Sequence, residues 1–158
     1  MKNSIKTGIA FGLTSGIITT LGLMVGLYSG TNSKLVVMGG ILTIAIADAF
    51  SDALGIHVSE ESKNNVKEKE VWEATISTFF SKFLFALTFV IPVLIVELKT
   101  AVIISVIWGI LVLGILSYLM AKSQGENTVY VVFEHVFIAA VVIFITHQLG
   151  LWISHTFV

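Results

Sequence analysis

The sequence predicts an all-α, polytopic membrane protein with five transmembrane helices. Of its 158 residues, 56% are apolar and 12% are charged, whereas soluble domains average about 45–50% apolar and about 25% charged. The mean hydropathy is +0.96. Five stretches have the roughly 20 mostly apolar residues that a helix needs to cross a bilayer. This composition excludes an ordinary soluble domain, a disordered chain and a nucleic-acid-binding protein.

The expected spans follow one another with short connections, so we expect a single five-helix transmembrane domain over residues 1–158. They are Ile9–Tyr28, Leu35–His57, Ile76–Val96, Ala101–Met120 and Val129–Ile153. The first span is too long for a signal peptide and ends without a small-residue cleavage site, so we expect it to be retained. The third contains Pro92, the only proline, and we expect a kink there.

Lysine positions predict the orientation, because the chain has no arginine and positive charges are retained in cytoplasmic loops. If the N-terminus is cytoplasmic, six lysines lie on that side: Lys2, Lys6, Lys63, Lys67, Lys69 and Lys122. Only Lys34 and Lys99 lie on the other side, and Lys82 lies within the third span. We therefore expect a multi-pass protein in contact with lipid, with a cytoplasmic N-terminus; in a prokaryote this membrane would be the cell membrane.

A short charged segment, Val58–Glu73, joins the second and third spans and would also be cytoplasmic. Its mixed charges at helical spacing favour a solvated helical extension of the second span. His57, Glu60 and Glu61 stand at i, i+3 and i+4, a spacing that places nitrogen and oxygen ligands on one helix face. A cytoplasmic patch that collects divalent cations is the alternative for these three residues.

Small residues recur at four-residue spacing in the first span, at Gly12 and Gly16 and again at Gly22 and Gly26. Such patterns let two helix backbones approach closely in lipid. Hydroxyl side chains that can hydrogen-bond across the helix pair lie beside them: Thr14, Ser15 and Thr19. The partner helix belongs either to the same chain or to a second subunit, and the sequence pattern leaves both open.

Ionisable groups inside the expected spans are the strongest functional signal, because a carboxylate at membrane depth normally faces a cavity, a partner or an ion. Asp48 and Asp52 lie on one face of the second span, and Glu134 and His135 lie in the fifth. At about 1.5 Å per residue, Asp52, Glu134 and Lys82 are expected at similar depth. Three carboxylates against one lysine leave uncompensated negative charge.

Two explanations fit this charge. In the structural one, Lys82 pairs with an aspartate, and the remaining acids are satisfied by hydrogen bonds in a membrane protein that transports nothing. In the functional one, Asp48, Asp52 and Glu134 bind a divalent cation, and His135 favours a transition metal. An enzyme is not expected, since neither His-Glu-x-x-His nor Gly-x-Ser-x-Gly occurs.

Two segments resemble the vacuolar iron transporter (VIT) family. Phe11-Gly-Leu-Thr-Ser-Gly-Ile-Ile-Thr-Thr-Leu-Gly-Leu-Met-Val-Gly26 is similar to that family's first span. Ala47-Asp-Ala-Phe-Ser-Asp-Ala-Leu-Gly-Ile-His-Val-Ser59 is similar to its second-span signature, which has Ser, Ala, Gly and Ser at the positions of Ser51, Ala53, Gly55 and Ser59. The five-span plan and the proline of the third span are similar as well.

The resemblance implies export of Fe²⁺, and often Mn²⁺, from the cytoplasm in exchange for protons. It also implies a homodimer whose pathway runs between the first and second spans of the two subunits. Gly12, Thr14, Ser15, Gly16 and Thr19 would then line the pathway or the dimer seam. A transported metal ion is the only ligand expected, with no tightly bound cofactor.

The chain departs from the family pattern in three places. Thr14 and Ser15 stand where the family has Asn-Asp, so the first span lacks its acidic residue. Asp52 stands in place of methionine and Ile56 in place of glutamate in the second span. The family's long cytoplasmic metal-collecting insertion is absent between the second and third spans. We expect a small, divergent member in which Asp48 and Asp52 take over as ligands.

Overall fold

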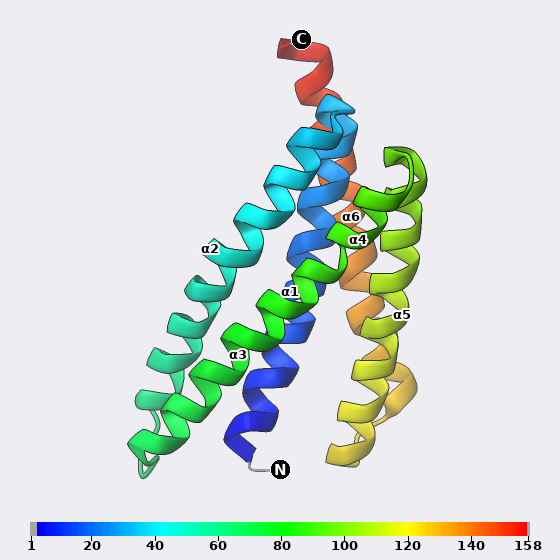
Figure 1. Cartoon of the computed structure of the whole chain (residues 1–158). Helices are drawn as coiled ribbons and strands as arrows, with labels where there is room; N and C mark the ends of the chain where they lie inside the picture. The colour runs from blue at the N-terminus through cyan, green and yellow to red at the C-terminus, as the bar shows by residue number, and fades with distance from the viewer. Residues whose placement is uncertain (1–2, 158) are drawn as a thin grey trace.

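The computed structural model describes residues 3–157, and every regular element in that range is an α-helix. Its six helices are α1 (Asn3–Thr31), α2 (Lys34–Glu61), α3 (Glu68–Thr88), α4 (Val90–Ile95), α5 (Leu98–Gln124) and α6 (Thr128–Phe157). Helix α4 continues the path of α3, so the chain runs up and down the bundle five times (Figure 1). The single domain expected over residues 1–158 stays a prediction. Lys2, one of the lysines used to predict the orientation, lies outside the described range.

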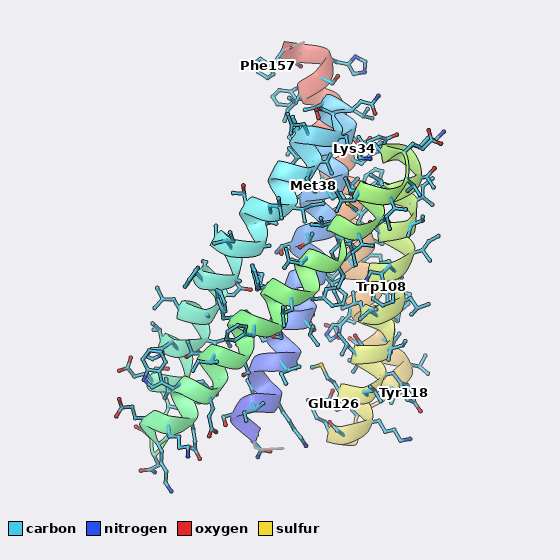
Figure 2. The ribbon with its side chains drawn as sticks, in the orientation of Figure 1. Lys34, Met38, Trp108, Tyr118, Glu126 and Phe157 are labelled. Atoms are coloured by element: carbon cyan, nitrogen blue, oxygen red, sulfur yellow. The ribbon has the colours of Figure 1, made fainter. Side chains whose placement is uncertain are left out.

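Five helical segments in this range are long and apolar enough to cross a membrane, which confirms the predicted fold class. Each expected span falls within one of them, except that the third ends one residue beyond Ile95, and the helices are longer than the apolar runs. The helices continue past these runs because backbone hydrogen bonds can extend into polar flanks, as from His57 to Glu61 at the end of α2. Large apolar side chains cover the outside of the bundle, as expected for a surface in contact with lipid (Figure 2).

Helix α1 is the central helix, since it packs against α2, α3, α5 and α6 (Figure 1). Helices α2 and α3 lie on one side of it, and α5 and α6 on the other. The α2–α3 and α5–α6 connections lie at the same end of the bundle as the N-terminus. Lys63 lies in the α2–α3 connection and Lys122 lies near the end of α5, so both are at this end of the bundle, as the lysine pattern predicts. The side of the membrane that this end faces stays a prediction.

The third span breaks where the proline predicts. Helix α3 ends at Thr88, and α4 begins at Val90, two residues before Pro92. Proline has no N–H to donate to the carbonyl four residues earlier, which here belongs to Thr88. The Thr88 hydroxyl accepts a hydrogen bond from Trp108 Nε1 on α5 at 3.2 Å, which ties the break to the neighbouring helix. The helix is thus interrupted near Pro92, where a kink was predicted.

The segment between the second and third spans is shorter and less helical than expected. Helix α2 extends only to Glu61, a turn follows, and α3 begins at Glu68. Lys67 N–H donates to Glu70 Oε2 at 3.4 Å at the start of α3. The segment Val58–Glu73 thus consists of the ends of two membrane helices and a six-residue connection.

The glycines of α1 pack against two different helices of the same chain. A Cβ at Gly12 would lie 2.2 Å from Ser81 Oγ and 2.6 Å from the Thr78 carbonyl oxygen, both on α3. Toward the other end of α1, a Cβ at Gly22 would lie 2.9 Å from a Val142 methyl group on α6. These glycines are needed for helix contacts inside the subunit. Because α3 covers Gly12 and Gly16 within the subunit, packing inside one chain accounts for this pattern, and a dimer seam through them stays a prediction.

Replacing Gly12 with alanine is expected to lower the free energy of unfolding by about 1–3 kcal/mol, the usual cost of overpacking. The added methyl group would press on backbone atoms of α3, so the two helices must separate. Thermal unfolding in detergent micelles measures the loss. Gly114→Ala on α5 is the matched control, because its Cβ would meet only a Val132 methyl group at 4.0 Å. Equal melting temperatures for the two variants would contradict this packing.

Candidate functional site

A charged cluster lies where α1, α2 and α3 meet in the interior of the bundle. The Lys82 ammonium group on α3 contacts Oδ2 of both Asp48, at 2.5 Å, and Asp52 on α2. Ser15 on α1 donates to Asp52 Oδ2 at 2.6 Å, and Thr19 donates to Asp48 Oδ2 at 2.8 Å. One lysine thus bridges the two carboxylates, while α1 supplies a hydroxyl to each.

The helix geometry explains why these groups meet. Asp48 and Asp52 are four residues apart and so lie on one face of α2, and Ser15 and Thr19 repeat that spacing on α1. The Lys82 side chain reaches this face across Gly16, whose Cβ would lie only 3.1 Å from Lys82 Cγ. The small residue at position 16 therefore makes room for the aliphatic part of a buried lysine.

The cluster is closed on the lysine side and partly open on the aspartate side. Only 2% of the Lys82 side chain is exposed, against 25% for Asp48 and 19% for Asp52. Asp48 also lines a pocket of about 630 Å³ between α1 and α2, together with Leu23, Thr43, Ala47 and Ser51. The Asp48 carboxylate is therefore reached from the α2 side, whereas the lysine is enclosed by protein.

Glu134 and His135 do not join this cluster. They lie on α6, which packs chiefly against α1 and α5. Glu134 is exposed, and His135 Nδ1 lies 2.8 Å from Ser117 Oγ on α5. No three of the histidine, aspartate and glutamate side chains within residues 3–157 come close enough together to hold a metal ion. The four expected ligands therefore form no single site within one subunit.

His135 instead lines a second pocket, of about 750 Å³, between α1, α5 and α6. Thr14, the other polar residue expected along the pathway, lines it as well. Lys6 and Met120 also contribute to the wall. Thr14 and Ser15 are neighbours in sequence, yet they face different sides of α1, one toward this pocket and the other toward the aspartates.

Two of the three residues of the expected cytoplasmic patch, His57 and Glu60, make contacts with different partners. Glu60 is buried and pairs with Lys63 at 2.6 Å. His57 Nδ1 lies 3.0 Å from the Thr75 hydroxyl, and its ring meets Trp72 edge-on at 4.9 Å between centroids. Glu61 is exposed. These contacts favour the structural explanation of the spacing over a preformed cation patch.

The family model provides the link to known proteins. The model of the VIT family matches residues 7–71 and 57–151, which together include all five spans over most of their length. The chain belongs to the VIT family. The two stretches overlap in the connection between α2 and α3. No curated protein matches the chain.

Membership of the VIT family indicates membrane metal-ion transport and is in keeping with a chain that is not an enzyme. Among the residues that the structure describes, Asp48 and Asp52 are the one acidic pair inside the membrane-spanning bundle of this VIT-family chain. Side chains of neighbouring helices hold both carboxylates. Lys82 is the main residue that the expected ligand set left out. Its position in the middle of a span was the available signal, since a lysine there requires a charged partner.

Proposed function

We propose that this protein carries a divalent transition-metal ion, Fe²⁺ or Mn²⁺, across the membrane, and that Asp48 and Asp52 bind the ion. The single observation that best supports this is an acidic pair at membrane depth beside an open pocket, in a chain of the VIT family. Carboxylate oxygens suit hard divalent ions, which are costly to move through lipid without such ligands.

We assign His135 a different part of the same path, whereas Glu134 is exposed on α6 and lines neither pocket. His135 and Thr14 line the pocket on the far side of α1 from the aspartates, at the end of the bundle that carries most lysines. An imidazole favours a transition metal over Mg²⁺. With the N-terminus in the cytoplasm, as the lysines favour, this pocket opens toward the cytoplasm, and the ion is exported in exchange for protons.

The working unit in this proposal is a homodimer that forms through α2. Small side chains form an exposed ridge at four-residue spacing on this helix: Gly39, Thr43, Ala47, Ser51 and Gly55. Within residues 3–157, a Cβ built at Gly39 or Gly55 has no heavy atom within 4 Å apart from its chain neighbours and the adjacent backbone of α2. Such ridges support close helix pairs in lipid. A second subunit on this face would cover the pocket beside Asp48.

Cross-linking tests the α2 seam cleanly, because the natural chain has no cysteine. Ala47→Cys is expected to give mostly covalent dimers with a short thiol-specific cross-linker in native membranes. Leu111→Cys is the control, since Leu111 is exposed on α5 and outside the proposed seam. Dimers that form as readily through position 111, or none through position 47, would place the subunit contact elsewhere or rule it out.

Uptake into reconstituted vesicles tests the function itself. Vesicles that contain the protein are expected to take up Fe²⁺ and Mn²⁺ faster than protein-free vesicles, with less uptake of Mg²⁺ and Zn²⁺. An imposed proton gradient opposite to the metal gradient is expected to increase the rate, and its collapse by an ionophore to remove that increase. Equal rates with and without protein, for all four ions, would contradict the proposal.

One observation favours a second function. Lys82 neutralises one of the two negative charges in an enclosed interior, as a purely structural network would. In that case the protein transports no ion, and the cluster only fixes how α1, α2 and α3 pack. The vesicle assay separates the two functions, because vesicles that contain the folded protein take up no metal ion if the cluster is only structural.

A further inference from the structure

The ammonium group of Lys82 occupies the point at which oxygen atoms from two helices converge. Its three hydrogens have three acceptors: Asp48 Oδ2, Asp52 Oδ2 and Ser15 Oγ, the last at 2.9 Å. Each carboxylate turns one oxygen toward this point. A compact cation held by several oxygens is the arrangement that a bound metal ion would have.

The charges show why a metal ion and this ammonium group exclude each other. Two carboxylates and one ammonium give the cluster a formal charge of −1, in surroundings where charges are weakly screened. A divalent ion at the same carboxylates would lie beside a like charge that is 98% enclosed by protein. That repulsion is large at separations of a few ångströms, so one cation has to leave before the other binds.

We infer that Lys82 is a specificity-determining residue, a tethered cation that fills the site between transport events and that the metal ion must displace. This inference rests on the proposed function. Either kind of ion leaves the displaced ammonium group without its carboxylate partners, and a monovalent ion only exchanges one positive charge for another. A divalent ion brings a second charge, so it alone gains enough attraction to the two carboxylates to displace the lysine.

The stem of the Lys82 side chain packs closely against α1 at Gly16, where a Cβ would lie 3.1 Å from Lys82 Cγ. Displacement therefore moves the charged end of the side chain, beyond this contact, more than its stem. The lysine side chain has four rotatable bonds and a compact charge at its end. Competition from the ammonium group for the same oxygens also weakens metal binding. A competing cation in the site lets a transported ion leave as well as enter.

Equilibrium binding of Mn²⁺ to the purified full chain in detergent, followed by electron paramagnetic resonance at one pH and one ionic strength, tests this inference. Lys82→Met removes the charge at similar length and is expected to bind Mn²⁺ at least about tenfold more tightly than the natural protein. Lys82→Arg keeps the charge and is the control, with no gain expected. Unchanged or weaker binding by Lys82→Met would overturn the inference.

A second pair of variants covers the case in which Lys82→Met fails to fold, since it leaves two carboxylates without a cation. Asp48→Asn with Lys82→Met leaves only one, and it is compared with Asp48→Asn alone. The double variant is expected to bind Mn²⁺ more tightly than the single one. Equal binding by these two would equally overturn the inference.

The proposed function can fail separately from this inference. One outcome is that the natural protein takes up Mn²⁺ in vesicles while neither Lys82→Met nor the Asp48→Asn, Lys82→Met double variant gains affinity over its reference. In that case the transport site stands and the role of Lys82 is wrong. If no variant binds Mn²⁺ and the natural protein takes up none, the proposed function is wrong, and this inference falls with it.

Discussion

Replacing Asp48 and Asp52 together with asparagine is expected to lower the free energy of unfolding by about 3–5 kcal/mol, the cost of leaving a buried charge unpaired. Together the two substitutions remove both negative charges that Lys82 contacts, and the lysine side chain is only 2% exposed. Ser15 alone cannot compensate, because a neutral hydroxyl offers no opposite charge. Thermal unfolding in detergent micelles measures the effect.

The control for this stability loss adds Lys82→Met to the same two substitutions. With no charge left in the cluster, most of the lost stability is expected to return, since the penalty belongs to the unpaired ammonium and not to the asparagines. If the Asp48→Asn, Asp52→Asn variant melts at the temperature of the natural protein, Lys82 is not held in the way that the structure describes.

Asp52→Asn alone is expected to stop metal uptake while the protein stays folded. Asp48 still contacts Lys82 at 2.5 Å in this variant, so the buried ammonium keeps a partner. The cluster has no net negative charge left to attract a cation. Because the loss of outer-shell partners alone costs about 10–100-fold in metal affinity, we expect the loss of a direct ligand to reduce uptake by at least about 100-fold.

Glu61→Gln is the matched control for that uptake measurement. Glu61 is exposed at the end of the same helix and lies outside the cluster, so its uptake is expected to equal that of the natural protein. A folded Asp52→Asn variant with normal uptake would exclude Asp52 as a ligand. A variant that no longer folds would instead favour the structural network.

The fold could be predicted from the sequence because the bilayer leaves few choices. A run of about 20 apolar residues can hardly be anything but a spanning helix, and Pro92 fixed the position of the one break. The partners of the α1 glycines could not be predicted. A small-residue pattern predicts that some helix packs closely but not which one: Gly12 meets α3, and Gly22 meets α6.

The candidate site could be predicted only in part. Spacing placed Asp48 and Asp52 on one face, and span depth placed Lys82 at their level, because both depend on helix geometry alone. The same depth argument placed Glu134 beside them, and there it failed. Depth gives the position along the membrane normal but not around the bundle, and α1 stands between α6 and the α2–α3 pair. The Thr19–Asp48 hydrogen bond likewise depends on which face α1 turns toward α2.

The location of bound metal in crystals soaked with Mn²⁺ tests the proposed site most directly, since anomalous scattering identifies the ion and its ligands together. We expect a peak about 2.0–2.6 Å from oxygens of Asp48 and Asp52, the range for hard cations, with the Lys82 ammonium group moved away from that position. A peak at Glu134 and His135, or at His57, Glu60 and Glu61, with none between the aspartates, would contradict the site and the role assigned to Lys82.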